Sequence, residues 1–218
     1  MTDSSISWPS PAEPGRAAVI ACGALAGELR AAVSSRGWDV EVHLLPALLH
    51  NHPREIAPRV EALAQSLIAG GRRVVVAYAD CGTYGALDGV CTRLGIERLA
   101  GAHCYELFAG LDTVAELFDE EPGTYLLTDF LVRTFSRTVL VELGLDRHPE
   151  LWNDYFGHYR RLVWLAQAPT PELRERARDV AARFALPLLV REVGRDRLTS
   201  ELERLLETAA PSGGEPRE

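Results

Sequence analysis

The stretch Arg73-Val-Val-Val-Ala-Tyr-Ala-Asp80, followed directly by Cys81-Gly82-Thr83, decides how this chain folds. A continuous apolar run of this length, closed by small and polar residues, is typical of a strand buried on both faces of a parallel sheet. Shorter apolar runs predict further strands at 17–21, 39–45, 96–99, 124–127, 161–166 and 186–190. Helical periodicity fills the intervals, at 24–35, 54–69, 84–94, 105–119, 129–142, 149–157, 171–184 and 197–208.

This alternation of strands and helices predicts an α/β fold, with a doubly wound, mostly parallel sheet and helices on both faces. The pattern also allows two Rossmann-like lobes, with a break near residues 120–130. We assign residues 16–209 to a single α/β domain, residues 1–15 to a flexible N-terminal arm and residues 210–218 to a flexible tail.

The composition excludes several classes of function. A net charge of −8 and the lack of a basic stripe argue against a nucleic-acid partner. No apolar run approaches the roughly 20 residues that span a bilayer, so we expect no membrane insertion. The chain has no lysine, which excludes a Schiff-base mechanism, a pyridoxal phosphate anchor and a Walker-type lysine. Four cysteines without a secretion signal fit reduced thiols in a cytoplasmic protein.

Three of the cysteines lie just beyond predicted strands. Cys22 follows the first strand, Cys81 follows the central one, and Cys104 follows the 96–99 run and a turn at Gly101. In a parallel sheet the residues past the strand ends collect along one edge, where such folds bind ligands. Three thiolates are a sufficient ligand set for zinc, so we predict that these cysteines bind a metal ion.

The competing interpretation is that each cysteine is simply a small buried hydrophobe, which is common for this residue type. Cys91 fits that interpretation, because it lies inside the predicted helix at 84–94. The three cysteines at strand ends fit it less well, because ligand sites concentrate there.

The turn after Cys81 contains small and polar residues that expose backbone amides. Gly82, Thr83 and Gly85 stand where a strand turns into a helix, and their free amides would lower a thiolate pKa or cradle an anion. We therefore predict that they contribute to cofactor binding. The glycine spacing by itself is a weak motif, since no G-x-G-x-x-G is present.

A second group of reactive side chains surrounds Cys104. His103 and Glu106 flank it, and Glu106 is positioned to act as a general base or as a partner of a metal ligand. We predict both as catalytic residues. The alternative for Glu106 is a carboxylate in the first turn of a helix, where it faces the positive end of the helix dipole.

Two other loops reach the same predicted edge. His50 and His52 follow the second strand and either supply imidazole donors or, with Pro53, begin the next helix. Asp129 follows the strand at 124–127, where it either caps the next helix or binds substrate. The aromatic residues between 148 and 159 recur at helical spacing, which favours core packing.

Several of these motifs, in this order, resemble a known family. They are Ala21-Cys22-Gly23, the Cys81-Gly82 turn, His103-Cys104, Pro122-Gly123-Thr124-Tyr125 and Tyr159-Arg-Arg-Leu-Val163. Together they resemble the family catalogued as domain of unknown function 1638, from about Ala17 to Leu189. The family has no established activity to carry over.

The resemblance implies a bacterial or archaeal cytoplasmic protein associated with corrinoid-dependent methyl transfer from methylated amines. It also implies that Cys22, Cys81 and Cys104 occupy the family's cysteine positions. His103 and Glu106 fall on positions that vary between subgroups of the family.

Three hypotheses follow. The first is a zinc-dependent component of methyl transfer, with a small-molecule substrate and a corrinoid protein or methyltransferase as partner. The second is an iron–sulfur protein for redox or reactivation work, in which the same cysteines and one more ligand hold a cluster. The third is a non-catalytic adaptor for a corrinoid protein, in which the cysteines only pack.

Overall fold

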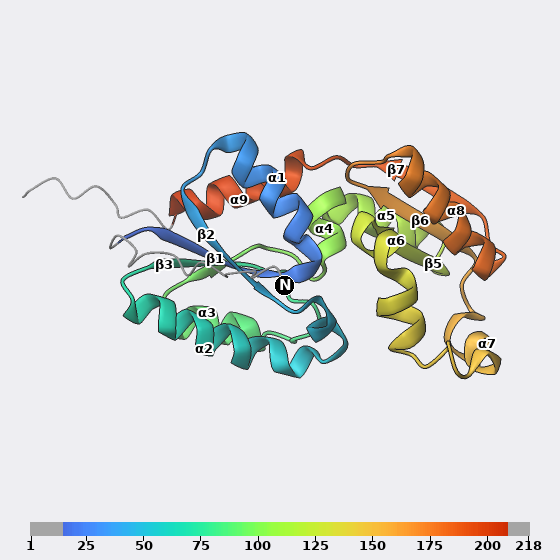
Figure 1. Cartoon of the computed structure of the whole chain (residues 1–218), viewed down its shortest axis with the longest axis horizontal. Helices are drawn as coiled ribbons and strands as arrows, with labels where there is room; N and C mark the ends of the chain where they lie inside the picture. The colour runs from blue at the N-terminus through green and yellow to red at the C-terminus, as the bar shows by residue number, and fades with distance from the viewer. Residues whose placement is uncertain (1–14, 209–218) are drawn as a thin grey trace, which may run out of the picture.

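The computed structural model describes residues 15–208, which form two parallel sheets with helices around them (Figure 1). The α/β fold with helices on both faces is therefore confirmed, in its two-lobed form. The predicted N-terminal arm, apart from Gly15, and the predicted tail lie outside the described residues. Within residues 15–208, no helix has the length and apolar character needed to cross a membrane.

Lobe 1 is built on a four-stranded sheet in the order β2-β1-β3-β4, with every pairing parallel. Helices α1 and α9 cover one face, and α2 and α3 cover the other (Figure 1). Its strands are β1 (Ala17–Cys22), β2 (Val40–Leu45), β3 (Arg73–Ala77) and β4 (Glu97–Arg98). Its helices are α1 (Ala26–Arg36), α2 (Ile56–Ala69), α3 (Ala86–Leu94) and α9 (Asp196–Thr208), with short 3₁₀ turns η1 (Gly23–Leu25), η2 (Ala47–Asn51) and η3 (Pro53–Glu55).

Lobe 2 is built on a three-stranded parallel sheet in the order β5-β6-β7. Helices α6 and α8 pack together on one face, and α5 covers the other. Its strands are β5 (Thr124–Thr128), β6 (Arg161–Ala166) and β7 (Leu188–Glu192). Its helices are α5 (Leu111–Glu120), α6 (Asp129–Phe135), the π-helix η4 (Ser136–Val141), the 3₁₀ turn η5 (Pro149–Leu151), α7 (Trp152–Phe156) and α8 (Pro171–Phe184).

The chain crosses between the lobes twice, and each crossing contains a glycine with positive φ. The outward crossing follows α4 (Cys104–Ala109) at Gly110, where φ is 86°, and the return passes Gly194, where φ is 67°. The two crossings lie side by side, because a Cβ on Gly110 would stand 3.2 Å from the guanidinium of Arg197. The sequence pattern predicts the boundary between the lobes near residues 120–130. In the structure, α5 already packs on the sheet of lobe 2.

Most predicted elements form, and the differences have local causes. The predicted helix at 105–119 divides into α4 and α5 because Gly110 adopts a backbone conformation that favours glycine. The predicted strand at 96–99 shrinks to the two residues of β4. The helix predicted from residue 84 begins at Ala86, since Tyr84 and Gly85 belong to a tight loop. The helix predicted over 129–142 continues from α6 as a π-helix.

Candidate functional site

A cavity of about 230 Å³ lies between the two lobes, at the carboxyl ends of strands from both sheets. Lobe 1 contributes residues after three of its strands, and α4 contributes Tyr105. Lobe 2 contributes the opposite wall from β5, α6 and η4: Tyr125, Thr128, Phe130, Leu131, Thr138 and Val139. Open α/β sheets bind ligands beyond the carboxyl ends of their strands, so this cavity is the candidate site.

Cys22, Cys81 and Cys104 all line this cavity, as the sequence predicts for residues beyond strand ends. In lobe 1 the strand order reverses between β1 and β3, and Cys22 and Cys81 stand at the ends of these two strands. The loops after β3 and β4 are joined by backbone hydrogen bonds, from Asp80 N to Gly101 O at 2.9 Å and from Cys81 N to Ala102 O at 2.8 Å. This pairing brings Cys104 to the same place.

All three cysteines are free, and their surroundings keep the thiols protonated. Burial raises the pKa of Cys22, and it raises the pKa of Cys81 to about 12 with a contribution from the neighbouring Cys22. The pKa of Cys104 is also raised, first by burial and then by Cys81 and Cys22. Because the three cysteines line the same cavity, a negative charge on one sulfur disfavours a charge on the next.

Each sulfur also lies near a group that can donate a hydrogen bond to a thiolate. The amide of Ala24 faces the sulfur of Cys22, and the amide of Cys104 faces the sulfur of Cys81. The hydroxyl of Tyr78 is buried beside Cys22 and lacks a hydrogen-bond acceptor among the described residues. A negatively charged sulfur would satisfy that hydroxyl better than a neutral thiol does.

The donor set fits a soft metal ion such as zinc in the kind and number of its ligands. Its arrangement is not that of a finished centre, because within residues 15–208 no three side chains of His, Cys, Asp and Glu are placed to hold an ion together. Binding a metal here therefore requires the sulfurs to turn toward a common point.

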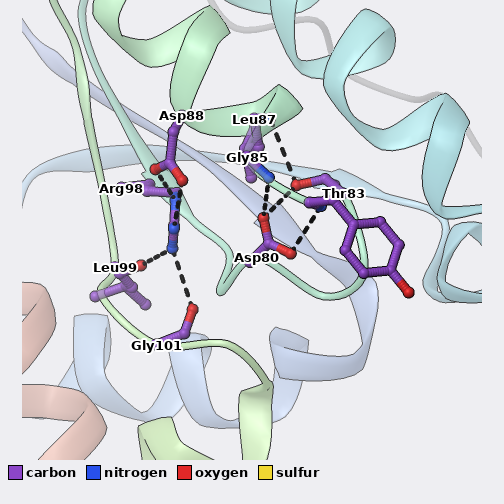
Figure 2. Close-up of polar contacts among 9 residues, drawn as sticks. Asp80, Thr83, Gly85, Leu87, Asp88, Arg98, Leu99 and Gly101 are labelled. Atoms are coloured by element: carbon purple, nitrogen blue, oxygen red, sulfur yellow. Dashed lines mark hydrogen bonds and ion pairs between the residues drawn. The ribbon is translucent and has the colours of Figure 1, made fainter.

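The loop after β3 is held by one carboxylate (Figure 2). Asp80 accepts hydrogen bonds from the hydroxyl of Thr83 at 2.6 Å, from the amide of Tyr84 at 3.0 Å and from the amide of Gly85 at 2.9 Å. Burial works toward a higher pKa for Asp80, but these hydrogen bonds and the nearby Arg98 lower it. The hydroxyl of Thr83 and the amide of Gly85, which the sequence predicts to bind a cofactor, are thus already hydrogen-bonded to Asp80. Gly82, Thr83 and Gly85 do not line the cavity.

Glu106 and His103, the predicted catalytic residues, are not among the side chains that line the cavity. The carboxylate of Glu106 turns back to accept a hydrogen bond from the amide of Ala102 at 2.8 Å. It lines a separate groove, together with Arg197 and Arg204 of α9. His103 lies near His50, and its contact with Glu106 measures 4.0 Å. Their catalytic role remains a prediction without support from contacts at the cysteine cavity.

Of the two histidines after β2, only His50 lines the cavity. Partial burial of its ring, together with the nearby His103, lowers the pKa of His50, which favours a neutral imidazole. His52 precedes the proline that begins η3. The sequence analysis missed the wall from lobe 2, because no local pattern in Tyr125 or Thr138 marks a residue that will face the other lobe.

Asp129 is neither a helix cap nor a cavity residue. Thr128 caps α6 by accepting a hydrogen bond from Leu131 N at 3.3 Å. The carboxylate of Asp129 is fully buried and accepts hydrogen bonds from Trp164 Nε1 at 3.0 Å, from Gln167 N at 3.1 Å and from Ala168 N at 2.9 Å. It fastens the end of β5 to the loop after β6, behind the cavity wall.

The chain belongs to the family described as "Protein of unknown function (DUF1638)", which it matches over residues 44–202. The family resemblance found in the sequence is therefore confirmed. A search of the curated proteins and a search of the solved structures both gave no match.

Proposed function

We propose that this DUF1638 protein binds a soft metal ion, zinc in the first instance, through Cys22, Cys81 and Cys104. The observation that carries the proposal is that three thiols from three separate strand ends line one cavity between the lobes. The substrate is a small molecule held in that cavity. The setting that we propose is corrinoid-linked transfer of methyl groups from methylated amines, as the family resemblance implies.

The residues around the sulfurs support thiolate formation once a metal ion arrives. A zinc ion in a three-thiolate site with an open position acts as a Lewis acid and orients or activates a bound thiol or methyl acceptor. The hydroxyl of Tyr78 and the amides of Ala24 and Cys104 would then donate to the negative sulfurs. Such hydrogen bonds to ligand atoms hold them in place and tune the metal.

A corrinoid would have to be carried by a partner protein. Cavities that hold drug-sized ligands measure about 300–1,000 Å³, and a corrinoid is larger than such a ligand. The cavity between the lobes measures about 230 Å³. A corrinoid protein or a methyltransferase is therefore the kind of partner that we propose.

An iron–sulfur cluster is less well supported by the side chains present. Clusters are usually held by four cysteines. Cys91 is the remaining cysteine of the chain, and it packs in the core of lobe 1 without lining the cavity. A cluster would need a ligand of another kind, whereas a three-cysteine zinc site would not.

Metal titration of the reduced, anaerobic protein tests the proposal. We expect one Zn²⁺ per chain, with Co²⁺ as a coloured substitute that reports thiolate ligation. Because the thiols are protonated in the metal-free protein, binding should release protons and weaken as the pH falls. Serine in place of Cys22, Cys81 or Cys104 should each weaken binding by about a hundredfold or more.

Cys91→Ser is the matched control, since it replaces a buried thiol that does not line the cavity. It should leave metal affinity unchanged. Absence of metal binding, or binding that ignores the three substitutions, would assign the cysteines to packing. A brown protein with iron-dependent visible absorption would favour the cluster. If methyl transfer in a reconstituted mixture of corrinoid protein, methylamine and folate acceptor proceeds fully without this protein, the methyl-transfer setting is wrong.

A further inference from the structure

The walls of the cavity between the lobes carry no fixed charge. Among the residues that line it within the described part of the chain, none is Asp, Glu or Arg. Lysine is absent from the whole sequence. The walls consist of aliphatic and aromatic side chains, the thiols of Cys22, Cys81 and Cys104, the imidazole of His50, and a few hydroxyl and amide groups such as those of Thr128 and Asn51.

Three carboxylates of the surrounding loops and helices are engaged elsewhere. The carboxylate of Asp80 holds its own loop, that of Glu106 accepts from Ala102, and that of Asp129 is surrounded by donors of lobe 2. Arg137 lines a neighbouring surface groove that shares Phe130 and Thr138 with the cavity. Arg137 itself does not line the cavity.

The volume limits the size of a ligand. An apolar cavity of about 150 Å³ takes up benzene. At about 230 Å³, the present cavity has room for a benzene ring with a short substituent, and it is too small for a nucleotide or a folate.

We propose that this cavity binds an uncharged organic molecule of roughly that size, with an apolar body and at least one hydrogen-bonding group. Transferring an ionised ammonium or carboxylate into walls without a counter-charge is strongly unfavourable, whereas a hydroxyl can be satisfied by Thr128, Thr138 or Asn51. As a statement about the substrate, this rests on the proposed function. As a statement about binding, it concerns the metal-free protein.

The consequence for the proposed chemistry is specific. A protonated methylamine would find no carboxylate in the cavity. The methylated amine would then react on a partner protein, and the molecule that enters this cavity would be an uncharged donor or acceptor of the methyl group.

Three probes of similar size that carry zero, positive and negative charge test the proposal at neutral pH: benzyl alcohol, benzylammonium and benzoate. Their affinities are measured by calorimetry on the metal-free protein. We expect benzyl alcohol to bind at least about tenfold more tightly than either ion. Equal or tighter binding of an ion would overturn the proposal, as would the absence of benzyl alcohol binding at millimolar concentration.

The aromatic rings of Tyr105, Tyr125 and Phe130 call for a second pair of probes, because such rings can surround a quaternary ammonium. Choline and its uncharged analogue 3,3-dimethylbutan-1-ol have the same shape. We expect the analogue to bind more tightly, and tighter binding of choline would overturn the proposal in favour of a cation site.

Two variants locate the binding. Ala47→Phe fills the cavity and should abolish binding of benzyl alcohol, while Ala100→Phe, in a groove on another part of lobe 1, should not. If Ala47→Phe does not fold, ligand-induced shifts of the Thr128 and Leu131 methyl resonances give the location in the unaltered protein. Failure of zinc binding with retained binding of benzyl alcohol would refute the proposed metal site and leave this proposal intact.

Discussion

The two lobes differ in the kind of side chain that follows their strands. After β1, β3 and β4, lobe 1 presents free thiols that line the cavity. After β5, lobe 2 places Asp129, whose carboxylate is fully buried and accepts from Trp164, Gln167 and Ala168. The difference teaches that reactive groups gather in one lobe, while the other provides a wall fixed by a buried carboxylate that is already satisfied.

The largest effect should come from removing the carboxylate that fixes the wall. Asp129→Ala leaves the indole N–H of Trp164 and two backbone amides buried without an acceptor. We expect the free energy of unfolding to fall by about 3–5 kcal/mol, measured by urea denaturation. The exposed Asp179 of α8 is the control, and its replacement by alanine should change stability by less than about 0.5 kcal/mol.

This substitution also tests the contrast between the lobes. If Asp129→Ala lowers stability by less than about 1 kcal/mol, lobe 2 does not depend on its buried carboxylate, and the contrast fails. If it abolishes benzyl alcohol binding while lobe 1 remains folded, the wall is required for the cavity.

The sequence predicted the site on lobe 1 because that site follows from local pattern and parallel topology. Apolar runs identify β1 and β3, and a parallel sheet must then bring Cys22 and Cys81 to one edge. The role of Asp129 was missed because its partners, Trp164 and Gln167, come from a strand and loop much later in the chain. No periodicity in a single segment encodes a contact of that kind.

The prediction for Glu106 shows a second limit. Its spacing from His103 placed both on one turn of a helix, but the direction of the side chain depends on the preceding loop. In the structure the amide of Ala102 offers a hydrogen bond, and the carboxylate turns toward it and away from the thiols. Competition between a distant site and a nearby backbone donor cannot be judged from spacing alone.

A smaller, pH-dependent effect should come from the corresponding carboxylate of lobe 1. Asp80→Asn places an amide N–H where the amide of Tyr84 now donates, and it should lower the free energy of unfolding by about 1–2 kcal/mol at pH 7. The folded-state pKa of Asp80 is lowered, so its contribution is present above the unfolded value of about 3.9 and is lost as the pH falls through the folded value. The difference in the free energy of unfolding between the unaltered protein and Asp80→Asn should therefore shrink below about pH 4.

Asp88→Asn is the control for that measurement, because Asp88 pairs with Arg98 on the surface beside the same loop (Figure 2). The Asp88 side chain is 54% exposed and that of Arg98 is 14% exposed, so this half-exposed pair should contribute about 1 kcal/mol, and added salt should weaken it. If the two variants lose equal stability with equal salt dependence, Asp80 acts only as a surface charge. A larger loss for Asp80→Asn, together with weaker metal binding, would mean that the loop positions Cys81.

The smallest effect concerns two of the three non-glycine residues with left-handed backbone conformations in the described part of the chain, the third being Cys81 itself. Tyr84 has φ of 51° in the loop of lobe 1, and Ala185 has φ of 52° at the end of α8 in lobe 2. Glycine adopts this conformation without steric strain, but it also gives the unfolded chain more freedom, so the two effects partly cancel. Ala185→Gly should therefore raise stability by about 0.5 kcal/mol, as glycine does at the ends of many helices.

Tyr84→Gly should gain a similar amount, because its side chain is 95% exposed and has no packing to lose. Thermal denaturation of both variants measures the changes. Suppose that Tyr84→Gly raises stability but lowers metal affinity, while Ala185→Gly raises stability without any effect on binding. The left-handed conformation of Tyr84, in the loop that contains Cys81, then serves the site and not the fold. If the two variants gain equal stability and metal binding is unchanged, Asp80 alone holds the loop. The two lobes would then differ only at their strand ends.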